Sequence, residues 1–525
     1  MTTNLVTNGG AVFANATVTG TWTSSGGVLS ATGTNAYVAA NSGVGTGDFT
    51  ITAVLHITSA TPTQAALVID GVADFGLTAT SAKKIYVRGF FFGDMTQELN
   101  LLSDFAAPGD DVTVVCKRTG DTVQCFINGT VIWEMPYEAD REFGKIAIRA
   151  GSTQLGIKQF SFDGATTSLT GWVSPYVRPH PLRAGSVDVY TGGSGGYNTY
   201  RIPALACSNA GTLLAICEGR KASASDSGDI DLLVKRSTDG GATWGPAILA
   251  YEEGGTATIT IGNPCPVVDK STGTIWLMFC RNTARAFIGK STDDGLTWAP
   301  RVEITSTVAG AGFGTSIHSG PGHGFQHGSG RLMFPSYHNF TSGGSTSYMI
   351  YSDDHGATFA YGGDVGLSSG EPAASLLSDG KVLMNSRAPR RVWQRIVGTS
   401  DNIGGSWMNV AQNATLVEPT CQGSMLSGFA APETKTVLFA NPNSTRRERM
   451  RVKLSNDDGA TWTDTLSIYE GSAAYSDIVQ VAGDHFGVLF ERNGYANLTF
   501  SPFSLADFPT RQTSGIKETA LWVLR

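Results

Sequence analysis

The octapeptide Ser237-Thr-Asp-Gly-Gly-Ala-Thr-Trp244 decides how most of the chain is interpreted, because it recurs at intervals of 48 to 61 residues. Its later copies are Ser291-Thr-Asp-Asp-Gly-Leu-Thr-Trp298, Ser352-Asp-Asp-His-Gly-Ala-Thr-Phe359, Ser455-Asn-Asp-Asp-Gly-Ala-Thr-Trp462 and a worn copy, Ser400-Asp-Asn-Ile-Gly-Gly-Ser-Trp407. In each copy Asp can bond the backbone of a turn and Gly can supply a positive φ. We expect the final aromatic ring to pack between neighbouring sheets. A unit repeated at this period indicates a fold built from successive similar modules.

A second repeat alternates with the octapeptide and consists of a turn, a short apolar run and then polar residues. Its six copies are Gly211–Arg220, Gly273–Asn282, Gly330–His338, Gly380–Arg387, Lys435–Asn441 and Gly487–Arg492. A continuous apolar run between turns is typical of a strand buried on both faces. Six units of about four strands each predict a six-bladed β-propeller. The polar residues that end these strands should then gather at one end of the central axis.

The composition supports an all-β protein with many short strands. Gly makes up 65 of the 525 residues and charged residues only 15%, while hydrophobic residues make up 41%. These values exclude a disordered chain and a long-helix protein, and the Gly residues have no collagen period. Residues 1–168 contain alternating runs and hairpin signals, which predict an N-terminal β-sandwich of the lectin-like jelly-roll type. A carbohydrate-binding role and a spacer role are both open for it. We expect a linker over 169–186 and the propeller over 187–525.

Charge, hydropathy and cysteine spacing limit the partners. The formal net charge is −7 with no basic run, so nucleic acid is not an expected partner. No run of about 18 apolar residues exists, so we expect no membrane span. The start of the chain lacks the pattern of a signal peptide. We expect a secreted or cell-surface protein whose signal has been removed, with a cytoplasmic location left open. Seven Cys residues, six of them spaced as in hairpins, are either core thiols or disulfides.

We expect neither a cofactor nor a metal. The cysteines have no metal-type spacing. The histidines at 318, 323, 327 and 338 are not spaced as a helical ligand pair. We interpret His323 as a loop residue near the site.

The strand ends and the loops beside them hold the candidate site. Arg201 lies within Tyr200-Arg-Ile-Pro203, and the polar residues at or near the other strand ends are Glu218, Arg220, Asp226, Glu371, Arg387, Arg447 and Tyr475. Asp229 and Asp231 compete with Asp226, and Arg446, Arg449 and Arg451 compete with Arg447. A loop at Arg390, Arg391 and Trp393 either contacts substrate or lies on the surface.

Tyr200-Arg-Ile-Pro203 together with four well-formed copies of the octapeptide, known as Asp boxes, resembles the exo-sialidase (neuraminidase) family of the bacterial and animal type. The resemblance covers roughly residues 187–525. It implies that Arg201, Arg387 and Arg447 bind the substrate carboxylate. It further implies that Asp226 is the acid/base, Tyr475 the nucleophile and Glu371 its base. Glu218 and Arg220 resemble the family's supporting Glu-x-Arg pair, and Gly320–His323 with Gln326 resembles a loop of the third blade.

The chemistry of these side chains agrees with such a reaction. Three guanidiniums can bind a carboxylate attached to the anomeric carbon through charge-assisted bonds. That carboxylate would repel a carboxylate nucleophile, whereas a neutral phenol avoids the repulsion, and Tyr is the known exception among glycosidase nucleophiles. The three arginines should also favour the phenolate of Tyr475. We therefore expect retention through a tyrosyl-linked intermediate.

Three functions are weighed. The first is an exo-α-sialidase acting on sialylated glycans. The second is a glycosidase for glycosides of a related ulosonic acid, either the deaminated nonulosonic or the octulosonic acid. The third is a non-catalytic glycan-binding propeller. The complete acid, base and nucleophile set favours the enzyme.

Overall fold

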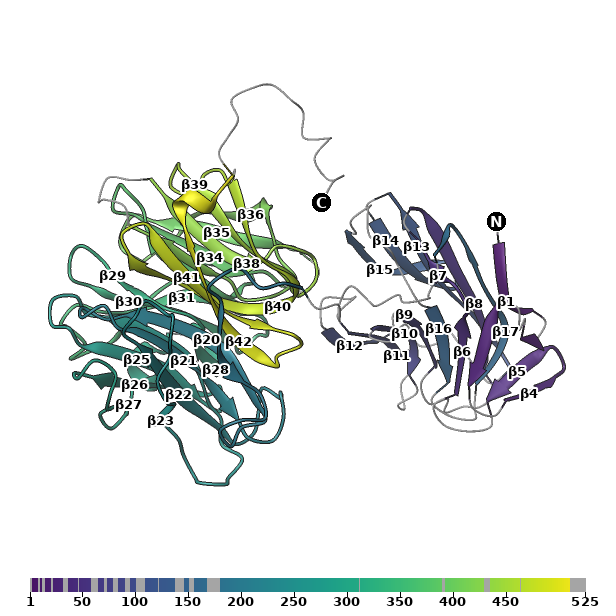
Figure 1. Cartoon of the computed structure of the whole chain (residues 1–525), viewed down its shortest axis with the longest axis horizontal. Coiled ribbons are helices and arrows are strands. Elements are labelled where there is room, and N and C mark those ends of the chain that lie inside the picture. The colour runs from purple at the N-terminus through teal and green to yellow at the C-terminus, as the bar shows by residue number, and fades with distance from the viewer. Residues whose placement is uncertain are drawn as a thin grey trace, which may run out of the picture.

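The computed structural model contains two bodies, both built of β-strands (Figure 1). In the N-terminal part it describes residues 2–7, 10–11, 15–19, 22–31, 36–45, 47–57, 65–69, 73–78, 84–89, 95–100, 109–120, 122–136, 146–150 and 155–167. In the C-terminal part it describes residues 180–509 except 311, 390–391, 429–434 and 463. Residues 168–179, which include residues 169–179 of the predicted linker, lie outside the described residues.

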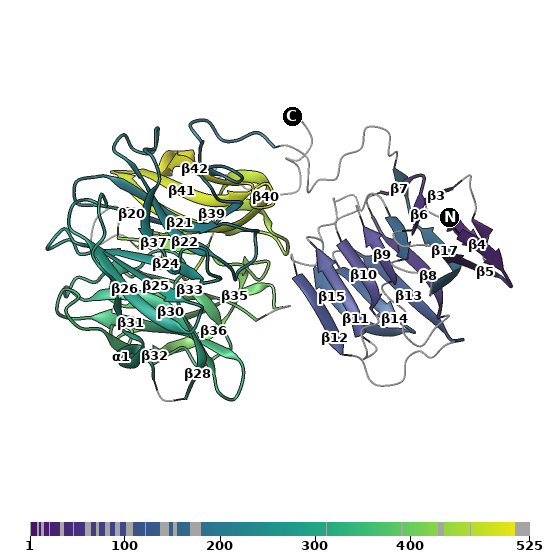
Figure 2. The ribbon, with the colours of Figure 1, turned by 90° about the horizontal axis from the view of Figure 1, so that it is seen from below.

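The N-terminal body is a sandwich of two antiparallel sheets, as predicted (Figure 2). One sheet has the order β15 (Thr130–Pro136), β14 (Thr122–Ile127), β13 (Asp111–Thr119), β8 (Phe49–Ile57), β17 (Leu155–Asp163), β1 (Thr2–Thr7) and β2 (Gly10–Ala11), with β5 (Val28–Ala31) on β17 and β4 (Trp22–Ser25) on β5. The other has the order β12 (Met95–Asn100), β11 (Lys84–Gly89), β10 (Ala73–Thr78), β9 (Ala65–Ile69), β16 (Ile146–Ala150), β6 (Ala36–Ala40) and β3 (Ala16–Thr19). A short pair joins β7 (Gly43–Val44) and β18 (Thr166–Thr167).

Alternation along the sandwich strands explains its core. In β14 every second residue is buried, and β13 alternates in the same way from Val112 onward. Successive side chains of a strand point to opposite faces, so one face of this sheet supplies the core. The buried side chains include Ile51, Val114 and Phe160.

The C-terminal body is the predicted six-bladed propeller, which encloses a central axis. The first blade holds β20 (Thr199–Cys207), β21 (Leu213–Arg220), β22 (Ile230–Ser237) and β23 (Ile248–Tyr251). The second holds β24 (Ile261–Val268), β25 (Ile275–Arg281), β26 (Arg285–Ser291) and β27 (Val302–Glu303). The third holds β28 (Phe313–Ser319), β29 (Phe325–Gln326), β30 (Leu332–Phe340), β31 (Ser345–Ser352) and β32 (Ala360–Asp364). The fourth holds β33 (Gly370–Leu376), β34 (Val382–Arg387), β35 (Gln394–Ser400) and β36 (Met408–Val417).

One long strand is shared by the last two blades. The fifth blade holds β37 (Ser424–Ser427), β38 (Val437–Pro442) and β39 (Glu448–Ser455), which pairs with the first half of β40 (Asp464–Ala482). The second half of β40 opens the sixth blade with β41 (His485–Arg492) and β42 (Asn497–Ser504). The first strand of the propeller in the sequence, β19 (Val187–Thr191), pairs with its last strand, β42. This pairing joins the beginning and the end of the propeller chain and closes the ring of blades.

Each Asp box forms the turn between the last two strands of its blade. In the first box Ser237 Oγ donates to Asp239 Oδ1 at 2.7 Å, and the Thr243 backbone N–H donates to the same oxygen at 2.9 Å. Gly241 has φ of +94°, and a Cβ there would come within 2.2 Å of Phe500 in the preceding blade. The Trp244 ring lies 5.5 Å from that Phe500 ring, so the aromatic does pack between blades, as predicted.

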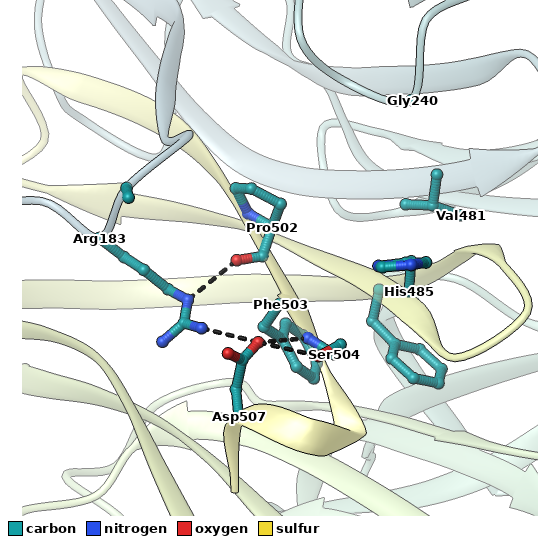
Figure 3. A pocket seen from close by; sticks show the side chains of 10 residues that line it. Arg183, Gly240, Val481, His485, Pro502, Phe503, Ser504 and Asp507 are labelled. Atoms are coloured by element: carbon teal, nitrogen blue, oxygen red, sulfur yellow. Dashed lines mark hydrogen bonds and ion pairs between the residues drawn. The ribbon is translucent and has the colours of Figure 1, made fainter.

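The chain entering the propeller is fastened to its last strand (Figure 3). Arg183 Nε donates to the carbonyl of Pro502 at 3.1 Å, and its Nη2 pairs with Asp507 at 2.7 Å. Asp507 lies in the short 3₁₀ turn η2 (Leu505–Asp507), and the one α-helix of the described residues, α1 (Thr305–Val308), is a single turn. Among the described helices, none has the length and apolar character needed to cross a bilayer.

All seven cysteines carry free thiols, and six of them are buried. Cys116 and Cys125 are opposite each other on β13 and β14 with their sulfurs 3.7 Å apart. The other two hairpin pairs do not face each other, because Cys207 is opposite Leu213 and Cys265 is opposite Met278. The alternative of core thiols therefore fits five of these six cysteines, while Cys207 is a half-buried thiol.

Candidate active site

Bulges in the innermost strands aim the candidate residues at one end of the propeller axis. The pairing register shifts after Arg201 in β20, after Gly370 in β33 and after Ala473 in β40. Ile202 and Glu371 lie at two of these shifts with positive φ of 57° and 38°. A bulge re-aims side chains, and positive φ in such residues persists only where the surroundings hold it. The inner strands therefore carry local strain where the candidate residues lie.

Tyr475 and Glu371 are bonded to each other, although 104 positions separate them. The Tyr475 hydroxyl donates to Glu371 Oε1, and Arg387 Nη1 donates to the Tyr475 oxygen at 3.0 Å. The same Arg387 nitrogen bonds Glu371 Oε2 at 2.6 Å. Burial acts to raise the pKa of Glu371, but the charge of Arg387 and its hydrogen bond outweigh it and lower that pKa. Glu371 is therefore an ionised acceptor for the phenol proton.

Arg387 and Arg447 favour the phenolate of Tyr475, as expected, because their charges act to lower its pKa, but they do not set the net shift. Burial raises the pKa of Tyr475 well above its usual value, and the charge of Glu371 adds to this effect. Arg387 and Arg447 oppose the shift without overcoming it. The resting group is a neutral phenol that needs Glu371 to accept its proton.

The three predicted arginines surround the Tyr475 ring. The guanidinium carbons of Arg201 and Arg447 lie 5.3 and 5.4 Å from the ring centroid, and Arg387 bonds its hydroxyl. Arg447 Nη2 also donates to the carbonyl of Thr420 at 3.2 Å. The site thus gathers three positive charges around one phenol.

The residues that compete with Arg447 lie elsewhere. Arg446 is buried and faces Glu448 at 3.4 Å. Arg449 and Arg451 both pair with the half-exposed Glu470. The guanidinium carbon of Arg447, by comparison, lies 5.4 Å from the centroid of the Tyr475 ring.

Asp226 lies in the loop after β21 and bonds Arg220 and Arg201. Its Oδ1 accepts from Arg220 Nη1 at 2.7 Å and from Arg201 Nη1 at 3.1 Å, while its side chain is 81% exposed. Desolvation acts to raise the pKa of Asp226, but the charges of Arg201 and Arg220 outweigh it and lower that pKa. The competitors Asp229 and Asp231 instead pair with Lys221.

Glu218 and Arg220 form a buried support under Asp226. Arg220 donates to Glu218 Oε2 from Nε at 3.0 Å and from Nη2 at 2.7 Å. The other Glu218 oxygen accepts from the backbone N–H of Asn263 at 2.8 Å. Arg220 is thereby fixed in the orientation in which it bonds Asp226.

Glu491, at the end of β41, is a site residue that sequence reasoning missed. This fully buried carboxylate accepts from Arg201 Nε and Nη2 and from the backbone N–H groups of Ile202 and Tyr475, at 2.9 to 3.2 Å. The sequence does contain a pattern that could have indicated Glu491, because it lies near the end of a buried strand, as Glu218 does. Tyr495 was missed too, and its ring lies 4.1 Å from the Arg201 guanidinium.

A cavity of about 150 Å³ opens beside the phenol. Tyr475, Glu371 and Asp226 line it, together with His318 and Tyr337. His323, interpreted from the sequence as a loop residue near the site, bonds the buried Asp477 at 2.7 Å and lines a pocket other than this cavity. The His318 position is the one that faces the candidate chemistry.

The other loop expectations are also resolved in part. Trp393 is only 6% exposed and belongs to the same buried cluster as the sandwich core, so it is not open to substrate. Arg390 and Arg391 lie outside the described residues. Within the described part of the chain, no three His, Cys, Asp or Glu side chains are grouped so that they could hold a metal ion.

Known proteins share this sequence pattern. The family model of the BNR repeat-like domain matches residues 211–488. A sialidase of Micromonospora viridifaciens is 32% identical over 353 residues, which cover 61% of this chain and 53% of that protein. A sialidase of Bacteroides fragilis is 28% identical over 342 residues, which cover 59% of this chain and 62% of that protein. The chain thus spans little more than half the length of these curated relatives.

Solved structures share the fold of both bodies. The Hadza microbial sialidase Hz136 has a TM-score of 0.58 and 21% identity, covering 88% of this chain and 94% of its own. The NanB sialidase from Streptococcus pneumoniae has a TM-score of 0.54 and 15% identity, with 88% and 95% covered. At these identities the likeness concerns the fold.

Proposed function

Because the chain belongs to the BNR-repeat sialidase family, we propose that it is a retaining exo-α-sialidase that releases terminal sialic acid from glycoconjugates. The observation that carries this proposal is the convergence of Arg201, Arg387 and Arg447 on the Tyr475 phenol, whose proton faces Glu371. A sialic acid has a carboxylate on its anomeric carbon. The arginines that bind the carboxylate must therefore lie beside the phenol that attacks that carbon.

The arginines would bind the carboxylate of the substrate. Guanidiniums present paired N–H donors that match a carboxylate and stay charged at any working pH. Glu491 neutralises part of the charge of Arg201 and fixes its plane, while Glu371 does the same for Arg387. With its carboxylate held in this way, the substrate has its anomeric carbon over the hydroxyl of Tyr475.

Tyr475 would attack the anomeric carbon while Glu371 accepts the phenol proton. A phenol is a weak nucleophile until a base removes its proton. Glu371 is ionised and already accepts the hydrogen bond, so proton transfer needs no rearrangement. Arg387 stabilises negative charge on the phenol oxygen as it develops, because it donates to that atom.

Asp226 would protonate the departing glycoside oxygen and later deprotonate the attacking water. In the free enzyme the pKa of Asp226 is lowered, since Arg201 and Arg220 act against its desolvation. A bound substrate carboxylate would share the charge of Arg201 and shield Asp226 from water. Both effects raise the pKa of Asp226 and bring it toward the protonated form that the first step requires.

Two displacements at the anomeric carbon give net retention. The test is incubation with an aryl α-ketoside of N-acetylneuraminic acid while proton NMR follows the anomer that is released first. We expect release of the sugar as its α-anomer, followed by mutarotation. Release of the β-anomer first would contradict the tyrosyl intermediate. If the protein released no sugar from any aryl ulosonic acid ketoside, the proposal that it is a glycosidase would be wrong.

A further inference from the structure

The loop that carries Asp226 runs over residues 221–229, between β21 and β22 of the first blade. Every residue from 222 to 227 is exposed. The side chain of Asp226 bonds Arg220 and Arg201, which both lie in the first blade. A substrate carboxylate would compete with Asp226 for Arg201. In the complex, the backbone of the loop therefore has to share in holding Asp226 in place.

Gly228, two positions after Asp226, is bonded to the side chain of Thr260 at the start of the second blade. The Gly228 backbone N–H donates to Thr260 Oγ1 at 3.1 Å, and the same hydroxyl donates to the Gly228 carbonyl at 3.1 Å. One hydroxyl thus uses its donor and an acceptor lone pair on both polar groups of one residue. The other recorded bond from this loop to the second blade comes from Lys221, five positions before Asp226.

Thr260 is itself fixed by the strands of the second blade. Its backbone N–H donates to Asn282 Oδ1 at 2.9 Å, and its carbonyl accepts from the Asn282 backbone N–H at 2.8 Å. The residue is only 6% exposed. Next to it, the carbonyl of Ile259 accepts from the backbone N–H of Ile230, where the loop ends, at 3.1 Å. The loop is therefore fastened to a firmly held part of the neighbouring blade.

The contact between Thr260 and Gly228 lies beside the candidate chemistry, since Thr260 and Asp226 both line the catalytic cavity. Gly228 is half-buried, so water can replace the Thr260 hydroxyl at little cost in stability. Water cannot tie the loop to the second blade in the same geometry. A general acid works only within hydrogen-bond reach of the oxygen that it protonates, and a small misplacement costs much of its rate.

Resting on the proposed function, we propose that Thr260 is a positioning residue that holds Asp226 at the leaving-group oxygen through its two hydrogen bonds to Gly228. Thr260 takes no part in the proton transfer itself. Its loss should therefore slow substrates whose leaving group needs a proton and spare those whose leaving group departs unaided.

The test compares kcat/KM for 3′-sialyllactose and for the 4-methylumbelliferyl α-ketoside of N-acetylneuraminic acid, because kcat/KM covers the steps up to departure of the leaving group. Thr260→Val keeps the shape of the side chain and removes its hydroxyl. We expect a loss of about tenfold or more for sialyllactose and of less than about threefold for the aryl ketoside. Thr260→Ser keeps the hydroxyl and should stay near the native values for both substrates.

Thr305→Val is the matched control. The Thr305 hydroxyl contacts the N–H and the carbonyl of Ala286 in the same two-way manner, at 3.0 and 3.4 Å, and Thr305 does not line the cavity. This variant should leave the ratio of the two substrates unchanged. In the background of Asp226→Asn, Thr260→Val should lower kcat/KM for sialyllactose by less than about twofold, because the group that it positions is gone. Equal losses for the two substrates, or a full further loss in the double variant, would overturn the inference.

Hydrogen–deuterium exchange separates this inference from the proposed function, because it needs no turnover. Overlapping peptides should show the Gly228 amide exchanging slowly in the native protein and in Thr260→Ser, and faster in Thr260→Val. Fast exchange in the native protein would overturn the inference, even if Thr260→Val fails to fold, and so would unchanged exchange in a folded Thr260→Val. If the native protein turned over neither substrate, the proposed function would fail, while slow exchange that the valine abolishes would still support the anchoring of the loop by Thr260.

Discussion

Glu491→Gln should damage both the stability of the propeller and its activity, although it changes one atom. Each oxygen of Glu491 accepts two hydrogen bonds. Oε1 accepts from Arg201 Nε and the Ile202 backbone, and Oε2 accepts from Arg201 Nη2 and the Tyr475 backbone. A glutamine has one oxygen and one NH₂ group, so in either orientation one guanidinium N–H and one backbone N–H face a donor.

The magnitude follows from those two lost acceptors. A buried donor left without an acceptor costs about 1–3 kcal/mol, and more when it is charged. Two of them give about 3–5 kcal/mol, which is also the cost of breaking a buried ion pair by removing one partner. The substitution should also weaken one charge-assisted bond from Arg201 to the substrate. This loss should cost about 1.5–3 kcal/mol of transition-state stabilisation and lower kcat/KM roughly 10–100-fold.

The assay is urea denaturation together with steady-state kinetics on an aryl ketoside. Glu470→Gln is the matched control, since this carboxylate is 44% exposed where it pairs with Arg451 and should contribute at most about 1 kcal/mol. If Glu491→Gln unfolds at the same urea concentration as the control and keeps native kinetics, then the four hydrogen bonds do not hold Arg201 and Tyr475 in place.

Three further outcomes follow from the same contacts. Asp226→Asn should lower kcat/KM about a hundredfold or more for a glycan-linked sialoside but far less for an aryl ketoside, whose leaving group needs no proton; equal losses would contradict the acid role. Hydrogen bonds from Thr297 lower the pKa of Asp293 from 3.8 to about 2. The stability that ionised Asp293 contributes is therefore complete above about pH 4 and is lost as the pH falls toward 2. In Asp293→Asn, the urea concentration at the unfolding midpoint should therefore vary less with pH over that range. Gly356→Ala would bring a Cβ within 2.2 Å of Trp276 at φ of +85° and should cost about 3 kcal/mol in urea unfolding, whereas Gly343→Ala, at φ of +89° in open space, should cost about 1 kcal/mol.

The fold could be predicted because its information is local and repeated. Each Asp box is a turn whose bonds lie within eight residues, so Ser237 to Trp244 carries the whole motif in its own sequence. The buried strand in each blade is equally visible as an apolar run. The sharing of β40 by two blades was not predictable, because it depends on the absence of a turn between its halves.

The placement of the site residues followed from the strand ends, whereas their electrostatics did not. A propeller brings polar strand ends together whatever their separation in sequence, and this explains why Tyr475 meets Glu371 across 104 positions. The same geometry buries the phenol, and no local pattern shows that burial outweighs two arginines in setting its pKa. His318 was likewise invisible as a cavity residue, since its partner Tyr337 comes from a different strand.

The central claim is that the six blades place Tyr475 as the nucleophile, and the most direct measurement is to trap the covalent intermediate. A 2,3-difluoro ulosonic acid forms a glycosyl-enzyme whose breakdown is slow, because the fluorine at C3 destabilises the cationic transition state. Intact-mass and peptide mass spectrometry should then find one added sugar, attached to the oxygen of Tyr475 and absent from Tyr475→Phe. An adduct on another residue, or turnover of substrate with no adduct on Tyr475, would contradict the account.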